Sequence, residues 1–392
     1  MQGLIVYVLI LPFISPCLCI RFHVGTTYGT TYNVMQYGAT GDGKSDDTKA
    51  FSSAWSSACK AEGISTLVIP SEKSFLVKKI DFSGPCKSEI RIQFEGKIVA
   101  PSKKEWETRP YLIHVENING LIVDGNSQGE IDGSGSTWWG CSDCDRPGVF
   151  QFHNCNNLTV SNLRISNSPR SHVSINECNG ATFSHVSITA PASSPNTDGF
   201  DISDSTNVLI QDSNIESGDD CIAINGGSSF VNAQRLICGP GHGISVGSLG
   251  RHGAKDEVSN VYVQNCTFRE TTNGARIKTV SGGSGHAKNI TYEQIILENV
   301  RNPIIINQEY NNYLEETSSV LVSSVTFRGF KGTYVDKVAI NLDCCSSGCY
   351  DIVLDQNNIV PAEKEKNYDS VICKNAHGKA ADTVPNVPCL SS

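Results

Sequence analysis

The chain has 392 residues, of which 39% are hydrophobic and 18% are charged, with a formal net charge of −9. This composition excludes an intrinsically disordered chain, and no basic stripe of the kind expected in a nucleic-acid binder is found. The length permits several small domains or one large all-β domain.

An apolar run opens the chain. Residues Gly3 to Ile14 are nearly all apolar, and no charged residue precedes Arg21. The run is too short to span a bilayer comfortably, so a secretory signal peptide is favoured over a membrane anchor. We expect the signal peptide over residues 1–20, and a single folded domain over residues 21–392. The mature protein is expected to be secreted, monomeric, and attached to neither membrane nor nucleic acid.

Cysteine usage agrees with secretion. Cys17 and Cys19 fall in the expected signal peptide, which leaves 14 of the 16 cysteines. An even, high count in a secreted chain predicts disulfides. Close spacing suggests two local pairs: Cys373 with Cys389, and Cys344 or Cys345 with Cys349. Zinc binding by Cys141-Ser-Asp-Cys144 is a weaker alternative, because no second ligand pair follows at finger spacing.

Asn-x-Ser/Thr triplets occur at three positions, which are Asn157, Asn265 and Asn289. In a secreted chain such triplets are acceptors for N-linked glycans. Each is a candidate only, since the triplet also arises by chance.

One helix is predicted near the N-terminus. Asp46 and Asp47 form an acidic cap, and apolar residues then recur four apart, at Phe51, Trp55 and Cys59. A calcium loop built from Asp42, Asp46 and Asp47 is the less economical alternative.

After the helix, short β-rich runs alternate with Asn, Gly and Ser. An apolar-x-apolar triplet, a polar turn and a second short strand recur in residues 150–160, 173–183, 200–210 and 222–232. Later units begin near Ile244, Arg276, Ile304 and Val338. The irregular period, roughly 22 to 30 residues, favours the coils of a parallel β-helix over propeller blades. A β-sandwich is the second choice, but it does not predict similarity from coil to coil.

Stacked coils place equivalent residues in ladders, about 4.8 Å apart. A spacing of 22 residues separates Phe200 from Ile222 and Ile222 from Ile244, and also relates Asp198, Asp220 and His242. Those three polar residues should therefore lie side by side on successive coils, with Asp219 beside Asp220. The predicted helix would cap one end of the stack.

Stacked carboxylates raise the pKa of one another, which is costly for a structural protein but useful to a hydrolase that needs one protonated acid and one ionised base. Singly, Asn196-Thr-Asp198-Gly199 and Asp219-Asp220 are also good turn sequences. Their shared register favours a catalytic site. Because adjacent residues in a strand face opposite ways, the chain must bend at Asp219 and Asp220 for both to reach one groove.

Two cations follow on the next coil. Arg276 and Lys278 are two residues apart, so their side chains should point the same way. They continue the line of acids, which favours the binding of a carboxylate group over a solvated strand face. The glycines that flank His242, Gly241 and Gly243, would let the backbone approach a ligand closely.

Four motifs together resemble the polygalacturonases, glycoside hydrolase family 28: Asn196-Thr-Asp198, Gly218-Asp-Asp220, Gly241-His-Gly243 and Arg276-Ile-Lys278. The segments at 32–43 and 238–250 resemble the plant branch, and the resemblance covers nearly the whole mature chain. It implies an all-β, right-handed parallel β-helix that inverts configuration as it hydrolyses α-1,4-linked galacturonan of pectin in the cell wall, without a metal or other cofactor.

The resemblance also implies roles. Asp219 resembles the general acid, Asp198 and Asp220 resemble the pair that activates water, and His242 resembles the residue that tunes the acid. Arg276 and Lys278 resemble the binders of the galacturonate carboxylate, and Asn196 belongs to the first motif. The family pairing of cysteines implies a Cys221–Cys238 disulfide.

The chain departs from the plant pattern at Asn307-Gln-Glu-Tyr310-Asn311. Asn replaces the usual Asp, and the Cys that often follows the Tyr is absent, which affects local cross-linking and subsite detail. Tyr310 matches the family tyrosine near the leaving side of the bond. Three alternatives stay open: a hydrolase of rhamnogalacturonan or xylogalacturonan, a calcium-dependent lyase, and a non-catalytic pectin-binding protein. Endo and exo action are not distinguished.

Overall fold

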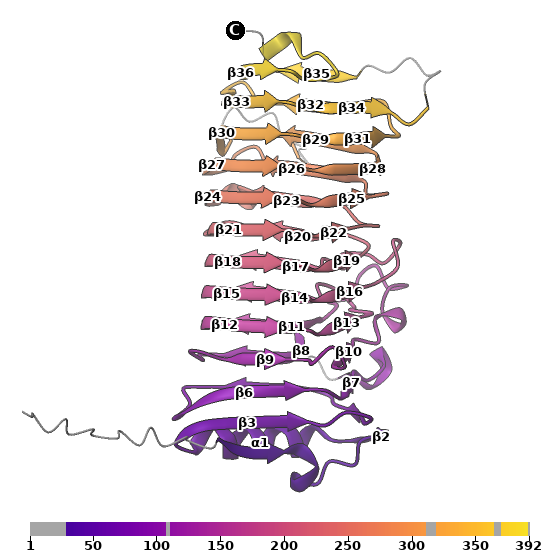
Figure 1. The fold of residues 1–392 in the computed structure, drawn as a ribbon, viewed down its shortest axis with the longest axis vertical. Coiled ribbons are helices and arrows are strands. Elements are labelled where there is room, and N and C mark those ends of the chain that lie inside the picture. The colour runs from indigo at the N-terminus through magenta and orange to yellow at the C-terminus, as the bar shows by residue number, and fades with distance from the viewer. Residues whose placement is uncertain (1–28, 107–109, 311–318, 364–369, 391–392) are drawn as a thin grey trace, which may run out of the picture.

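The fold is a right-handed parallel β-helix, a single stack of coils that runs from the N-terminal to the C-terminal end of the chain (Figure 1). The computed structural model describes residues 29–106, 110–310, 319–363 and 370–390. The expected signal peptide and Asn311 lie outside the described residues. Every pair of neighbouring strands is parallel and belongs to a different coil, which confirms the predicted solenoid and rules out the sandwich.

Three long sheets form the walls. Sheet A contains β1 (Thr30–Asn33), β3 (Gly63–Ile69), β6 (Ser88–Phe94), β9 (Ile122–Asp124), β12 (Asn156–Ser161), β15 (Asn179–Ser184), β18 (Thr206–Gln211), β21 (Ser229–Gln234), β24 (Lys255–Gln264), β27 (Ser284–Glu293), β30 (Leu321–Arg328), β33 (Cys349–Asp355) and β36 (Ala376–Ala381). Sheet B contains β2 (Asp42–Asp46), β4 (Ser74–Leu76), β7 (Lys97–Val99), β10 (Glu130–Asp132), β13 (Arg164–Ser166), β16 (Ser187–Thr189), β19 (Asn214–Glu216), β22 (Ile237–Cys238), β25 (Thr267–Arg269), β28 (Ile296–Val300), β31 (Lys331–Tyr334) and β34 (Asn358–Pro361). Sheet C contains β5 (Ile80–Ser83), β8 (Tyr111–Glu116), β11 (Gly148–His153), β14 (Val173–Asn176), β17 (Phe200–Ser203), β20 (Ile222–Ile224), β23 (Ile244–Leu249), β26 (Asn273–Thr279), β29 (Asn302–Asn307), β32 (Ile340–Asp343) and β35 (Val371–Lys374).

The recurring Asn and polar residues between strands have a backbone reason. At the corner where the chain passes from sheet A to sheet B, successive coils place one residue in the left-handed region. These residues are Asn162, His185, Asp212, Arg235, Asn265 and Gln294, with φ between 50° and 56°. Asn tolerates this conformation better than other non-glycine residues, because its short polar side chain can hydrogen-bond locally. The corners therefore explain the irregular but repetitive sequence.

The core is a set of apolar ladders inside the stack. Phe200 pairs with Ile222, and Ile222 pairs with Ile244, as the spacing of 22 residues predicts. All three side chains are fully buried. This shared register also aligns the polar turns that precede β17, β20 and β23.

An amphipathic helix, α1 (Thr48–Lys60), closes the N-terminal end of the stack (Figure 1). It buries Phe51 against Phe75, with ring centroids 5.3 Å apart, and Trp55 against Phe82 at 4.5 Å. Short 3₁₀ turns complete the set: η1 (Val34–Tyr37), η2 (Lys103–Glu105), η3 (Gly135–Thr137), η4 (Arg251–Gly253) and η5 (Pro388–Leu390). No helix among the described residues is both long and apolar enough to cross a membrane.

The two aspartates before α1 make different hydrogen bonds. Asp46 caps the helix, since its carboxylate accepts hydrogen bonds from the amide of Thr48 at 3.1 Å and from its hydroxyl at 2.6 Å. Asp47 is buried and accepts instead from the amides of Thr40 and Gly41. Both carboxylates are thus occupied by the chain itself, which explains the acidic pair without a calcium loop.

Five disulfides are found among the described residues: Cys59–Cys86, Cys141–Cys144, Cys221–Cys238, Cys344–Cys349 and Cys373–Cys389. They include the pair implied by the family resemblance and the local pairs expected from spacing. The Cys141–Cys144 bond corrects the zinc alternative, because disulfide sulfurs are not available as thiolate ligands. Four cysteines stay unpaired and buried, which are Cys155, Cys178, Cys266 and Cys345. They fill the core as small apolar side chains.

Candidate active site

The candidate site lies where successive coils pass from sheet B to sheet C. Asn196 and Asp198 precede β17, Asp219 and Asp220 precede β20, and His242 precedes β23. The pairing of these strands aligns the turns, and the amide of Gly199 donates to the carbonyl oxygen of Asp220 at 2.9 Å. The structure therefore brings together the residues that the sequence repeat predicts as neighbours.

The chain bends at Asp219 and Asp220, as required for both to reach one groove. Strand β19 ends at Glu216 and β20 begins at Ile222, so residues 217–221 lie outside regular strands. The amide of Asp220 donates to Asp219 Oδ1 at 2.8 Å, and the amide of His242 donates to the carbonyl oxygen of Asp219 at 2.7 Å. These bonds fix the bend from within and from the next coil.

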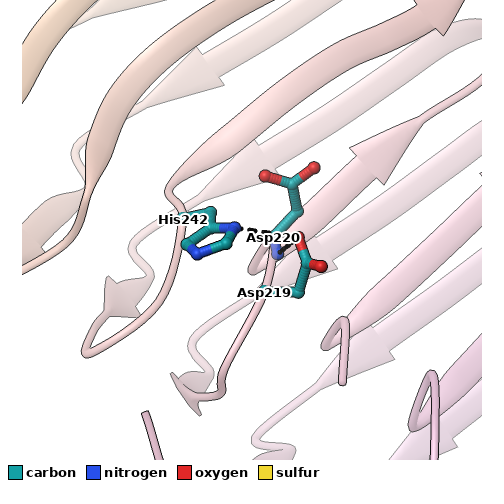
Figure 2. Close-up of side chains that lie close together, drawn as sticks. All are labelled: Asp219, Asp220 and His242. Carbon is teal, nitrogen blue, oxygen red and sulfur yellow. Dashed lines mark hydrogen bonds and ion pairs between the residues drawn. The ribbon is translucent and has the colours of Figure 1, made fainter. Parts of the chain in front are cut away.

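Asp219 faces His242 (Figure 2). The Nδ1 atom of His242 lies 3.0 Å from Asp219 Oδ1. Burial pushes the pKa of Asp219 upward. The hydrogen bond and charge of His242, together with the charge of Lys278, outweigh burial and hold the pKa below its ordinary value. In the ligand-free protein, Asp219 is thus stabilised as a carboxylate.

The Asp220 carboxylate points away from the histidine ring (Figure 2). Its Oδ1 accepts hydrogen bonds from Arg276 at 2.6 Å and from the Ser245 hydroxyl at 2.8 Å, and its Oδ2 accepts from Lys278 at 2.8 Å. Asp220, Arg276 and Lys278 are all buried, with relative exposures of 1%, 9% and 6%. Arg276 and Lys278 point the same way, as expected from their spacing, but toward an internal carboxylate.

Asp198 has the opposite electrostatic setting to Asp219. Burial raises its pKa well above the ordinary value, and the neighbouring carboxylates of Asp219, Asp220 and Asp201 raise it further. His172 lies behind it with Nδ1 3.0 Å from the carbonyl oxygen of Asp198, and complete burial lowers the pKa of His172 to about 4. His172 is therefore neutral and supports the backbone of Asp198.

A groove of about 610 Å³ lies over these residues. This volume falls in the usual range for small-ligand sites. The groove is lined by Ser142, Cys144, Asp145, Arg146, Arg170, Ser171, Asn196, Asp198, Asp201, Asp219, Asp220, Ala223, Asn225, Gly247, Ser248, Arg251, Lys278 and Tyr310. Lys278 reaches the groove, whereas Arg276 is bound behind Asp220 and lies outside this lining.

Two further expected residues border the groove. The Tyr310 ring stands near both cations, with Lys278 Nζ 5.3 Å from its centroid and the Arg276 guanidinium carbon 6.0 Å from it. The side-chain amide of Asn196 lies between Arg146, which donates to its oxygen at 2.6 Å, and Asp219, to which it donates at 3.4 Å. Asn196 thus connects the first motif to the second.

Within the described residues, one group of three side chains offers ligand atoms within 4.8 Å of one another, namely Asp219, Asp220 and His242. The donor set does not fit a divalent cation. Both oxygens of Asp220 already accept hydrogen bonds from the cationic Arg276 and Lys278, and a metal ion beside them would be repelled. The calcium-dependent alternative therefore finds no support in this cluster.

The flanking glycines serve packing between coils, contrary to the expected approach of a ligand. A Cβ on Gly243 would lie 2.2 Å from the carbonyl oxygen of Asn273, and one on Gly241 would lie 3.0 Å from that of Asp219. Gly243 also has φ of 79°. Neither glycine lines the groove.

Several residues of the site were not anticipated, among them Asp201, Ser245 and the arginines Arg146 and Arg170. A signal for the first two was present. The middle residue of each apolar-x-apolar triplet points outward, and on sheet C this position holds Ser174, Asp201, Ala223, Ser245 and Arg276 in register. Within that ladder, Asp201 and Ala223 line the groove, whereas Ser245 and Arg276 hydrogen-bond the carboxylate of Asp220.

Comparisons with known proteins agree with the motifs. Residues 59–382 match the model of glycosyl hydrolases family 28. A protein named "Probable polygalacturonase" from Arabidopsis thaliana is 44% identical over 374 residues, which cover 93% of this chain and 81% of the relative. A polygalacturonase of Persea americana is 42% identical over 86% of this chain and 75% of its own. The crystal structure of an endo-xylogalacturonan hydrolase from Aspergillus tubingensis has a TM-score of 0.78 at 27% identity, covering 90% of this chain and all of that one. The protein is thus a member of family 28 of the glycosyl hydrolases.

Proposed function

We propose that this protein is a polygalacturonase that hydrolyses the α-1,4-galacturonosyl bonds of pectin with inversion of configuration. One observation carries the proposal: three carboxylates and the cation Lys278 face a single groove, inside a chain whose relatives at more than 40% identity are named polygalacturonases. Acids are needed to cleave a glycosidic bond, and a cation is needed to hold an acidic sugar.

We assign the roles as follows. Asp219 protonates the leaving oxygen, and His242 orients and tunes it through the contact at 3.0 Å. Asp198, with Asp220 behind it, activates the attacking water. Lys278 binds the carboxylate of the sugar, Arg276 holds Asp220 in place, and Tyr310 and Asn196 border the bound sugar. The hydrogen bonds of Asp220 to both cations support its positioning role.

The cluster also supplies the proton that acid catalysis needs. Burial and the carboxylates around Asp198 keep its pKa well above the ordinary value, so this group of acids retains a proton where an isolated aspartate has lost it. Since the charge of Asp219 acts on Asp198, we infer that this proton is available to Asp219. An acidic sugar that takes up the charge of Lys278 removes one of the interactions that hold Asp219 ionised, and so moves the proton toward Asp219.

The decisive experiment measures reducing ends released from polygalacturonate at acidic pH. The wild-type protein should release them, and Asp219→Asn should lower the rate at least about 100-fold, because it removes the acid. Asp351→Asn is the matched control, since this exposed aspartate lies on β33 in sheet A, away from the groove. No release by the wild-type protein across the acidic range would refute the proposal.

A substrate panel separates the related activities. Homogalacturonan, rhamnogalacturonan and xylogalacturonan are compared under the same conditions, and the largest rate is expected on homogalacturonan. Unsaturated products that absorb in the ultraviolet would indicate a lyase. Binding without turnover would indicate a non-catalytic pectin-binding protein.

We further propose that the mature chain, residues 21–392, is a secreted, monomeric, single catalytic domain that acts on the cell wall. The five disulfides among the residues that the structure describes, and the exposure of the glycan acceptors Asn157, Asn265 and Asn289, support secretion. Expression in a secreting host tests this. We expect the protein in the medium with a new N-terminus near residue 21, a monomeric mass, and a decrease in mass on removal of N-glycans.

A further inference from the structure

The groove continues past the carboxylates toward the N-terminal coils. Arg146 precedes β11, Arg170 precedes β14 and Asn196 precedes β17, so these side chains leave successive turns between sheets B and C. They occupy the same series of turns as Asp219 and His242. On the other side of the acids, Lys278 and Tyr310 line the groove. Cationic side chains therefore lie on both sides of the carboxylate cluster.

Neither arginine makes a close ion pair in the part of the chain that the structure describes, although the positive charge of Arg170 acts on the nearby carboxyl of Asp201 and lowers its pKa against the effect of burial. Within the described residues, no carboxylate oxygen lies within the 4.0 Å of an ion pair from either guanidinium, although Arg164, Arg235, Arg269, Arg276 and Arg328 all make such pairs. Burial and the neighbouring charge of Arg170 lower the pKa of Arg146. Two like charges left close together at a groove wall favour an anion between them.

The local structure holds Arg146 ready for a ligand. Its guanidinium donates to the side-chain oxygen of Asn196 at 2.6 Å, which uses only part of its donors. The Cys141–Cys144 disulfide closes the short loop before it, and Cys144 lines the groove. Arg170 is exposed and leaves the next turn. A guanidinium fixed in this way matches a carboxylate with paired hydrogen bonds.

We propose that Arg146 and Arg170 form a second carboxylate-binding subsite, which holds an acidic sugar unit on the opposite side of the cleavage point from Lys278. This inference rests on the proposed function. From the coil of Arg170 to that of Lys278, sheet C advances through β14, β17, β20, β23 and β26, four spacings or roughly 19 Å. That length exceeds one sugar ring. A polysaccharide chain bound at both ends of this span crosses the acids and is cut internally.

Substrate length provides the test. Kinetic constants are measured on oligogalacturonates of increasing length for the wild-type protein, Arg170→Gln and the double variant with Arg146→Gln. We expect KM for long oligomers to rise about tenfold or more when the subsite is lost, with a much smaller change for the shortest cleaved oligomer. Arg235→Gln is the control, because it removes an exposed arginine, paired with Asp212, at the corner between sheets A and B.

Arg170→Gln carries the decisive result, because Arg146 also contacts Asn196 and its loss could disturb the acids directly. Calorimetric binding of a long oligogalacturonate, measured with Asp219→Asn present in every variant compared, tests the subsite independently of turnover. Its affinity should fall about tenfold in Arg170→Gln, whereas binding of the fully methyl-esterified oligomer, which has no charged carboxylate, should not change.

Equal KM and equal affinity in Arg170→Gln and wild type would overturn the subsite. So would release of monomer alone by the wild-type protein, since internal cleavage gives a mixed ladder and a rapid fall in viscosity. A wild-type protein that binds the long oligomer through Arg170 but releases no reducing ends would instead refute the proposed function and leave the subsite supported.

Discussion

Asp198 and Asp219 are coil neighbours whose pKa values are displaced in opposite directions. Burial and three carboxylates raise the pKa of Asp198, whereas the contact with His242 and the charge of Lys278 bring that of Asp219 below its ordinary value despite burial. A folded-state pKa above the unfolded value gives stability that is complete below about 3.8 and is lost as the pH rises through the folded value. Asp198 therefore lowers the stability of the fold at neutral pH.

Asp198→Asn should stabilise the protein at pH 7, on the order of 1 kcal/mol, because it removes a carboxyl whose ionisation among other carboxylates is unfavourable. The gain should shrink as the pH falls toward that of an ordinary aspartate. Asp219→Asn should behave in the opposite way: a depressed pKa gives stability above the unfolded value, so the variant is less stable at pH 7 and the loss closes under acid. Melting temperatures of both variants and wild type, measured at a fixed scan rate from pH 7 down to acidic pH, show how the stability difference of each variant depends on pH. Parallel curves for the two variants would contradict the assignment.

At the scale of one element, the turn that carries His242 depends on close approach between coils. Gly243 has φ of 79°, and an added Cβ would lie 2.2 Å from the carbonyl oxygen of Asn273. Gly120 provides a comparison, because its φ is 78° and nothing lies within 4 Å of an added Cβ. Comparing alanine substitutions at the two glycines therefore separates the cost of backbone strain from the cost of a steric clash.

Gly120→Ala should cost about 1 kcal/mol, the strain of a left-handed alanine. Gly243→Ala should cost clearly more, about 3 kcal/mol or above, because the turn must also move away from the next coil. Such a movement displaces His242, so activity should fall with stability in Gly243→Ala and persist in Gly120→Ala. Urea unfolding and reducing-end assays measure both effects. Similar losses in the two variants would mean that the close approach is unimportant.

The same elements show what sequence could and could not predict. The register of β17, β20 and β23 could be predicted from residue spacing, because residues one coil apart in the sequence pair with each other in the stacked strands. The ion pairs of Arg276 and Lys278 with Asp220 could not be predicted from the residue spacing. Spacing shows which way a side chain points, but it does not show that side chains on β26 extend past β23 to a carboxylate on an earlier coil. The unpaired Arg146 and Arg170 were missed because an unpaired charge can be recognised only after its surroundings are known.

At the scale of the whole molecule, the N-terminal end of the stack of coils must be covered. Each coil contacts only its neighbours, so without a cover the coil at the N-terminal end would expose unpaired strand edges and the core. Helix α1 covers this end, and Trp55 packs on Phe82 at 4.5 Å while its indole nitrogen donates to the carbonyl oxygen of Ser83 at 3.2 Å. The carboxylates lie several coils away, in the turns before β17 and β20 (Figure 1).

Trp55→Ala should therefore separate stability from activity. Loss of a buried tryptophan from the cap should cost about 3–5 kcal/mol and promote association through the uncovered end. Ser52→Ala, on the exposed face of the same helix, should stay within about 0.5 kcal/mol of wild type. Light scattering measures the association, and reducing-end assays measure the specific activity of the monomer isolated at low temperature. We expect that activity to match wild type, because each coil of a solenoid contacts only its neighbours and the cap does not touch the coils that carry the acids. A folded Trp55→Ala monomer with greatly reduced turnover would show that the cap controls the geometry of the distant acids.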